Sequence, residues 1–171
     1  MKNDKIISSK DAAKLVKDGD TLAITGFVSF GLAESILTEL EQRFIDEKSP
    51  KDLFLFHVAG IAGDGIKRGI NHFSHDKMIR KLYCSNCSLA PKIAKYIAEN
   101  HFATYMKPQG VLSHLTRAIA GGKPGVITHV GLKTFCDPRV EACHANEKCN
   151  EIDEEVVELI HIGNKEHLFL S

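Results

Sequence analysis

Short apolar runs alternate along this chain with segments of helical periodicity, and this alternation constrains the fold more than any other feature. Residues 53–58 form an almost unbroken apolar run, which is typical of a strand covered on both faces of a sheet. Between Leu32 and Phe44, apolar residues recur at steps of four, a spacing that predicts an amphipathic helix. The repeated order of strand and helix predicts an open, mostly parallel α/β sheet flanked by helices, in a single domain over residues 1–171.

The remaining elements are expected from the same alternation. Further strands are predicted at 21–25, 80–84, 102–106, 126–130 and 156–162, and further helices at 9–18, after Ser88 and after Gly110.

Local signals add detail at the helix ends and at the last residues of the chain. Ser9 and Ser88 are predicted N-caps, and Ile119 is expected on the buried face of the last helix. Residues 166–171 resemble the start or middle of a strand, so we expect the sheet to be incomplete at Ser171. An uncovered apolar edge of this kind predicts self-association into an oligomer.

The overall charge and the absence of long apolar runs exclude some classes of function. Lys plus Arg number 22 and Asp plus Glu number 22, a balance that argues against a dedicated nucleic-acid surface. No apolar run approaches the ~20 residues of a membrane span, and residues 1–15 lack the apolar core of a secretory signal. We therefore expect a cytoplasmic protein whose five cysteines are reduced.

Three of the predicted strands lead into loops that contain glycine, at 26–31, 59–65 and 108–110. The carboxyl ends of parallel strands meet at one edge of a sheet, where ligands of α/β proteins bind. Glycine allows a ligand to approach the backbone closely, so a binding crevice is expected at this edge. The candidate substrate-binding residues are Gly26, Phe27, Val28, Gly31, Gly60 and Gly110.

Several common motifs are missing from these loops. The spacing of the glycines does not match the G-x-G-x-x-G fingerprint of dinucleotide-binding proteins, and the chain has no P-loop. The nucleophile elbow of serine hydrolases requires G-x-S-x-G, whereas Ser29 has Phe27 in place of the first glycine. The sequence therefore gives little support to these three classes.

The cysteines suggest a zinc site as a weaker alternative. Cys84 and Cys87 form a C-x-x-C pair, and Cys143, His144 and Cys149 are the residues that would complete a tetrahedral site. A second C-x-x-C pair is missing and the other spacings are irregular, so we favour buried, reduced cysteines and no metal.

The histidines give no clear general base. His57 lies within an apolar strand and is interpreted as a hydrogen-bonded core residue. His72 and His75 flank Phe73 in a polar loop without a visible carboxylate partner. No histidine is therefore assigned a catalytic role.

Between residues 19 and 146 the sequence resembles the amino-terminal part of family I coenzyme A transferases, in the acetate and propionate branch. The order and spacing of the matching segments are specific, although each segment alone is short. In chain order, the matching segments are 25–28, 31–34, 68–72, 89–92, 108–111, 123–131 and 134–139. The resemblance implies an open α/β domain of the NagB/RpiA-like type.

The resemblance also implies a mechanism. In this family a glutamate attacks an acyl-CoA and forms a glutamyl-CoA thioester, which exchanges with a second carboxylic acid in ping-pong fashion. Coenzyme A is then a substrate, and no cofactor is implied. The glutamine of the family's Pro-Gln-Gly turn resembles a hydrogen-bond donor to the thioester oxygen, so Gln109 is expected to be the oxyanion donor here.

The nucleophile itself is expected from elsewhere. The family's Glu-Asn-Gly motif does not occur in this chain, and Glu99-Asn100-His101 is interpreted as a helix end. The resemblance therefore implies a complementary glutamate-bearing domain or subunit in a homo- or hetero-oligomer. The alternative is an inactive remnant or a small module that binds acyl-CoA or carboxylate. Ala142 and Cys143 replace glycines of the family, which predicts an altered loop.

Overall fold

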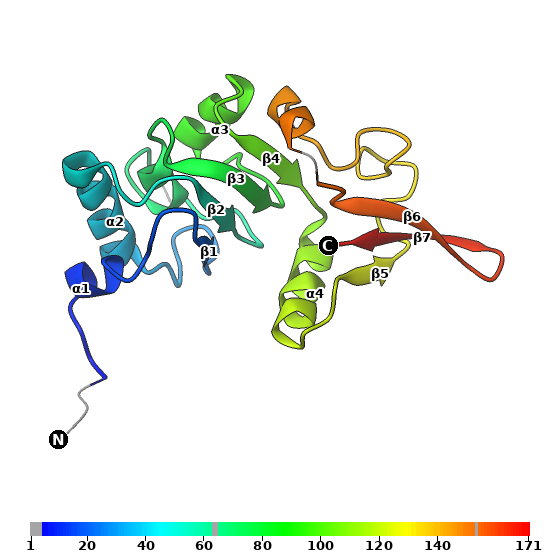
Figure 1. Ribbon diagram of the computed structural model, residues 1–171, viewed down its shortest axis with the longest axis horizontal. Coiled ribbons are helices and arrows are strands. Elements are labelled where there is room, and N and C mark those ends of the chain that lie inside the picture. Colours follow the sequence, from blue (N-terminus) through cyan, green and yellow to red (C-terminus); the bar gives the residue numbers. More distant parts are fainter. Residues whose placement is uncertain (1–4, 63–64, 153) are drawn as a thin grey trace.

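The computed structural model describes residues 5–62, 65–152 and 154–171, which form two sheets surrounded by helices (Figure 1). The first sheet is parallel, with strand order β1-β2-β3-β4, and the second is antiparallel, with order β5-β7-β6. The strands are β1 (Thr21–Ala23), β2 (Leu53–Phe56), β3 (Ile79–Cys84), β4 (Ala103–Met106), β5 (Val126–Thr128), β6 (Val157–Ile162) and β7 (Lys165–Leu170). The predicted α/β class is confirmed.

The helices follow the predicted order with shifted ends. They are α1 (Ser9–Ala13), α2 (Glu34–Glu47), α3 (Pro91–Ala98) and α4 (Gln109–Ala120), with 3₁₀ helices η1 (Gly69–Phe73) and η2 (Glu147–Glu151). In the described residues, no helix has the length and apolar character needed to cross a membrane.

Both predicted serine caps are wrong. Ser8, one residue earlier than expected, caps α1 by accepting a hydrogen bond from the Asp11 N–H at 3.0 Å. The α3 helix begins at Pro91 with Ala90 at the N-cap position, because proline needs no N–H partner in a first turn. The Ser88 hydroxyl donates to Asn86 instead.

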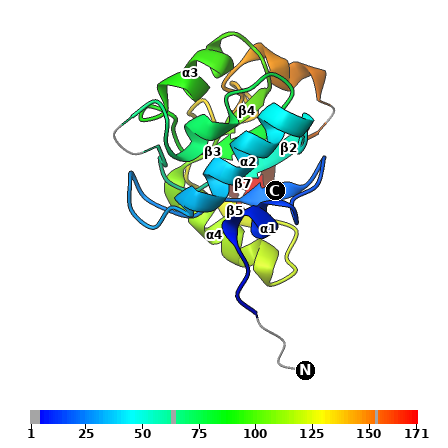
Figure 2. The ribbon, with the colours of Figure 1, turned by 90° about the vertical axis from the view of Figure 1, so that its left-hand side faces the viewer.

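Alternating residues of β2 divide the core into two clusters. Leu53 and Leu55 pack against α1, α2 and α3, whereas Phe54 and Phe56 face the cluster formed with α4 and the second sheet. Figure 2 shows the end of the molecule where α1 and α2 cover the first sheet. The prediction that Ile119 is buried is wrong: it is 59% exposed, because the buried stripe of α4 passes through Ala118 instead.

The last strand is central within its sheet. β7 pairs with β5 on one side and with β6 on the other, so the expectation of an unpaired final strand is wrong. The outer edge of β4 is also covered, because Met106 N–H donates to the carbonyl of Cys143 and Ala145 N–H donates to Thr104, both at 2.9 Å. Apolar strand edges therefore do not account for the self-association that was expected near Ser171.

Candidate functional site

The loops after β1 and β2 meet at the carboxyl edge of the parallel sheet. The Val28 N–H donates to the carbonyl of Gly60 at 2.8 Å and joins the two loops. Gly26 and Gly31 have φ angles of +144° and +68°, which glycine adopts without strain, and Phe27 is 61% exposed. Five of the six predicted substrate-binding residues are thus brought together by the fold.

The third predicted loop lies farther along the same edge. Gln109 and Gly110 follow β4, which is separated from β2 by β3 in the sheet. Gly63 and Asp64, in the second predicted loop, lie outside the described residues. The candidate site is therefore an edge that extends across the four parallel strands.

Gln109 is the first residue of α4 and is exposed, with Pro108 at the N-cap position. Among the described residues, its side chain has no hydrogen-bond partner. The first N–H groups of a helix lack intrahelical acceptors and form the positive end of its dipole. A free carboxamide beside these groups gives an array of donors suited to a developing oxyanion.

A hollow of about 700 Å³ lies between α4 and β5. Its wall includes Gly110, His114, Arg117 and Lys123. This side of α4 therefore combines open space with basic side chains next to the free carboxamide.

His72 and His75 do have carboxylate partners, contrary to the expectation from sequence. The two ring nitrogens of His72 lie 2.9 Å from Glu34 Oε1 and 2.5 Å from Glu41 Oε2, and His75 Nε2 lies 2.9 Å from Glu41 Oε1. Glu34 also accepts a hydrogen bond from the N–H of Gly69 at 3.1 Å. These contacts join sequence positions more than thirty residues apart and hold η1 against α2.

The electrostatics of Glu41 reflect these contacts. Burial raises its pKa, but hydrogen bonds and charge interactions with His72 and His75 outweigh burial, so the pKa lies below its ordinary value. The carboxylate is thereby stabilised in its charged form. We interpret this cluster as a structural support for the loop after β2.

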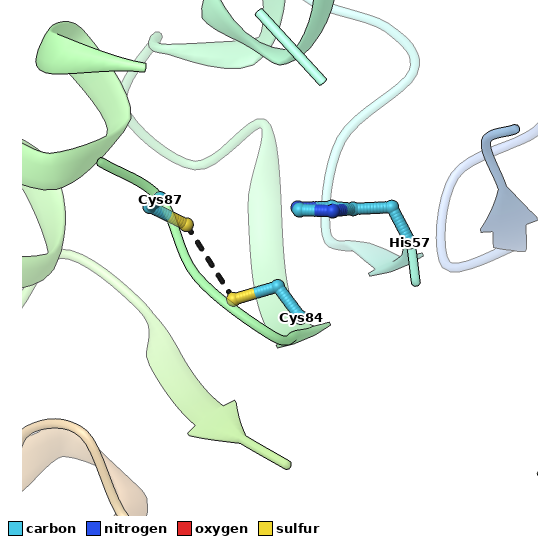
Figure 3. Close-up of side chains that lie close together, drawn as sticks. All are labelled: His57, Cys84 and Cys87. Atoms are coloured by element: carbon cyan, nitrogen blue, oxygen red, sulfur yellow. Dashed lines mark hydrogen bonds between the residues drawn. The ribbon is translucent and has the colours of Figure 1, made fainter. Parts of the chain in front are cut away.

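Three residues with metal-ligating side chains lie together at the ends of β2 and β3 (Figure 3). His57, Cys84 and Cys87 are buried, and their ligand atoms all lie within 4.8 Å of one another. The hydrogen bond with Cys84 and the neighbouring His57 hold the pKa of Cys87 below its ordinary value, against the effect of burial. Among the described residues, this is the group with metal-ligand geometry.

The zinc set considered from sequence is wrong in its composition. Cys143 and Cys149 lie in the second core cluster, where the Cys149 thiol donates to the carbonyl of Thr104 at 3.1 Å. His144 packs edge-on against the ring of Tyr105. The C-x-x-C pair instead meets His57, which sequence spacing alone did not indicate.

Two buried lysines were missed by sequence reasoning. Lys81 Nζ lies 2.5 Å from Glu154 and 4.2 Å from the centre of the Phe54 ring. Lys107 Nζ lies 4.0 Å from the centre of the Tyr83 ring, and burial lowers the pKa of Lys107 to about 8. A lysine within an apolar strand pattern was the available signal. Lys81 lines a cavity of about 370 Å³ together with Phe54, Phe56, Tyr83, Leu115 and Glu154.

An open parallel sheet with glycine loops and free donors at its carboxyl edge defines a ligand-binding α/β domain. Comparison with known families then specifies which one. The model of the coenzyme A transferase family matches residues 6–169, and the chain belongs to this family.

Similar curated proteins carry related names. The chain is 33% identical to the caffeate CoA-transferase of Acetobacterium woodii and 29% identical to the acetate CoA-transferase YdiF of Escherichia coli K12. Both matches cover 96% of this chain, but only 31% and 30% of those proteins. It is also 29% identical to one subunit of a probable succinyl-CoA:3-ketoacid coenzyme A transferase of Bacillus subtilis, over 74% of this chain and 50% of that one.

Solved structures show the same relation. The apoenzyme of the acyl-CoA transferase YdiF from Escherichia coli O157:H7 superposes with a TM-score of 0.90 at 28% identity, covering 96% of this chain and 32% of that one. A thioester complex of the same enzyme with CoA superposes equally well, at 27% identity, over 96% of this chain and 31% of that one. The chain thus spans about a third of the length of these enzymes.

Proposed function

We propose that this chain is the amino-terminal domain or subunit of a transferase that moves coenzyme A between an acyl-CoA and a short-chain carboxylate such as acetate or propionate. A complementary glutamate-bearing domain or subunit supplies the nucleophile. The glutamate attacks the acyl-CoA, and a glutamyl-CoA thioester forms and then exchanges with the second acid. Coenzyme A takes part as a substrate, without a further cofactor.

The exposed carboxamide of Gln109 is the observation that carries this proposal. It is free of other partners among the described residues and lies at the positive end of α4. In the proposed reaction it donates to the thioester oxygen as negative charge develops there. Gly26, Phe27, Val28 and Gly31 (with Gly60 and Gly110) form the edge along which the acyl-CoA binds.

The relatives support the partner and leave the acid open. The Bacillus subtilis relative is named as one subunit of its enzyme, which favours a separate partner subunit for this chain too. The names of the relatives include acetate, caffeate and a 3-ketoacid. Acetate or propionate as the acid is therefore part of the proposal, and it rests on the segments matched in the sequence.

The test is to combine this chain with its glutamate-bearing partner and follow transfer of coenzyme A from an acyl-CoA to labelled acetate or propionate. Transfer with ping-pong kinetics supports the proposal. No transfer, with both chains folded and associated, refutes it. Isothermal titration of the acyl-CoA into this chain alone separates the alternative, because a binding module takes up acyl-CoA without transferring it.

A further inference from the structure

We infer that His57, Cys84 and Cys87 bind one Zn²⁺ ion, which joins the loop after β2 to the loop after β3. This site is separate from the proposed transferase chemistry and is not needed for the argument about Gln109. It rests on four observations: the strand register, the orientation of His57, the spacing of the two sulfur atoms and the burial of all three side chains.

The register of β2 and β3 places the three residues together. Phe56 is paired with Tyr83, and the His57 N–H donates to the carbonyl of Tyr83 at 3.0 Å. His57 and Cys84 therefore follow a matched pair at the same edge of the sheet. Cys87 returns to this point in the turn that leads to α3, and Figure 3 shows the ring of His57 extending toward the two sulfurs.

The hydrogen bonding of His57 is that of a metal ligand. Its Nδ1 lies 2.7 Å from the carbonyl oxygen of Ala59, which can only accept a proton, so Nδ1 carries the hydrogen. Nε2 then presents a lone pair, and it is buried with no hydrogen-bond partner. Metal-bound histidines usually donate their other ring N–H to a carbonyl or carboxylate group in this way. A ligand for Nε2 would satisfy a buried polar atom that is otherwise costly to leave unpaired.

The sulfur atoms have a spacing close to that of a metal site. Cys84 Sγ and Cys87 Sγ are 3.4 Å apart. Two Zn–S bonds of ~2.3 Å at tetrahedral angles place the sulfurs roughly 3.8 Å apart, whereas a disulfide bond requires ~2.05 Å. Zinc binding therefore needs a small outward movement of the thiolates.

Charge and ligand type favour zinc. Binding converts both thiols to thiolates and releases two protons, so two negative charges meet the two positive charges of the ion. The resulting neutral group is far less costly to bury than separate charges. Thiolate and imidazole are preferred zinc ligands, and one coordination position is left for a water molecule or another donor.

The burial of the ligands assigns the ion a structural role. His57, Cys84 and Cys87 are 1%, 0% and 5% exposed, so an ion held by them is largely shielded from substrate. The ion would connect the segment before Gly60 to the segment before α3. Since Gly60 also accepts the hydrogen bond from Val28, the zinc would stabilise part of the edge described above.

The 171-residue chain is the material for the test, produced in medium that contains zinc and purified with a thiol reductant. Elemental mass spectrometry is expected to find about one zinc ion per chain. Protein produced with cobalt instead is expected to show thiolate-to-cobalt charge-transfer bands and the intense visible bands of tetrahedral coordination. Metal saturation is expected to raise the Tm by roughly 5–10 °C relative to metal-free protein.

Variants identify the ligands. Cys87→Ser and His57→Gln are each expected to reduce bound zinc at least about tenfold and to remove the Tm shift. Cys149→Ser changes a buried cysteine of the other core cluster and is expected to retain the metal and the cobalt spectrum. Circular dichroism establishes that each variant is folded. Wild-type protein without zinc or cobalt binding, or a Cys87→Ser variant that binds as well as Cys149→Ser, would overturn the inference. A Cys84–Cys87 disulfide in reductant-treated protein would overturn it as well.

Discussion

Gly69 lies against the carbonyl group of Ile61 so closely that a β-carbon added to Gly69 would lie 2.3 Å from the carbonyl oxygen. The φ angle of Gly69 is +58°, and the next N–H, that of Ile70, donates to the same carbonyl at 2.9 Å. The glycine of the 68–72 segment is therefore required by a backbone contact between η1 and the loop after β2.

Gly69→Ala is expected to lower the free energy of unfolding by roughly 3 kcal/mol. About 1–2 kcal/mol comes from the left-handed backbone, and about 1–3 kcal/mol comes from the steric overlap with Ile61. Denaturation in urea measures the change.

A matched variant separates the two contributions. Gly122 has a similar φ of +67° but open space around its Cα, so Gly122→Ala carries the backbone cost alone, about 1 kcal/mol. Equal losses of stability for the Gly69 and Gly122 variants would show that the contact with Ile61 is not tight.

The loop at Ala142 retains the backbone conformation of a glycine loop. Ala142 and Cys143 have φ angles of +50° and +66°, so the prediction that the loop changes to avoid positive φ is wrong. The Cys143 N–H donates to Phe135 and its carbonyl accepts from Met106, which holds the strained backbone in place.

Ala142→Gly is therefore expected to stabilise the protein by roughly 0.5–1 kcal/mol, because relief of the backbone strain exceeds the greater entropy of the unfolded glycine. Ala94→Gly, an exposed substitution within α3, is the control and is expected to destabilise by about 1 kcal/mol. Thermal or urea unfolding of both variants gives the comparison. A loss of stability in both would contradict the assignment of strain to Ala142.

Lys107→Met is expected to change how stability depends on pH. Burial lowers the pKa of Lys107 to about 8, whereas an unfolded lysine titrates near ~10.4. Below about pH 8 the folded state carries a buried charge and is penalised in full. Between these two pKa values the unfolded chain binds more protons, so this contribution to stability rises with pH.

The difference in unfolding free energy between Lys107→Met and wild type is accordingly expected to shift by about 2 kcal/mol in favour of wild type from about pH 7 to about pH 10. Other groups titrate in this range, and comparing the two proteins cancels their contributions. Lys165→Met, which removes an exposed positive charge, is the control for net charge. A constant difference over this range would refute a lowered pKa for Lys107.

Local sequence patterns predicted the elements well, while contacts between distant elements remained outside their reach. The apolar run of β2 and the four-residue spacing of α2 follow from burial on sheet and helix faces, so both elements were predicted. The central position of β7 depends on pairing with two strands, and the sequence of one strand does not specify its neighbours.

The same reasoning explains what was missed at the candidate sites. His57 meets Cys84 and Cys87 because β2 and β3 pair in one register, and a shift of that register would separate them. The contact of His72 with Glu34 likewise depends on how η1 packs on α2. By contrast, the exposed position of Gln109 at a strand-to-helix turn was predictable from Pro108 and the apolar residues on either side.

The proposed role of Gln109 is tested most directly by the turnover of the Gln109→Leu variant in the transferase assembled with its glutamate-bearing partner. Leucine retains the size of the side chain and removes its donors, and Gln42→Leu, an exposed substitution on α2, is the matched control. The account predicts that kcat falls about 10²–10³-fold for Gln109→Leu, with KM little changed, and that Gln42→Leu turns over like wild type. Equal kcat values for the two variants would contradict it.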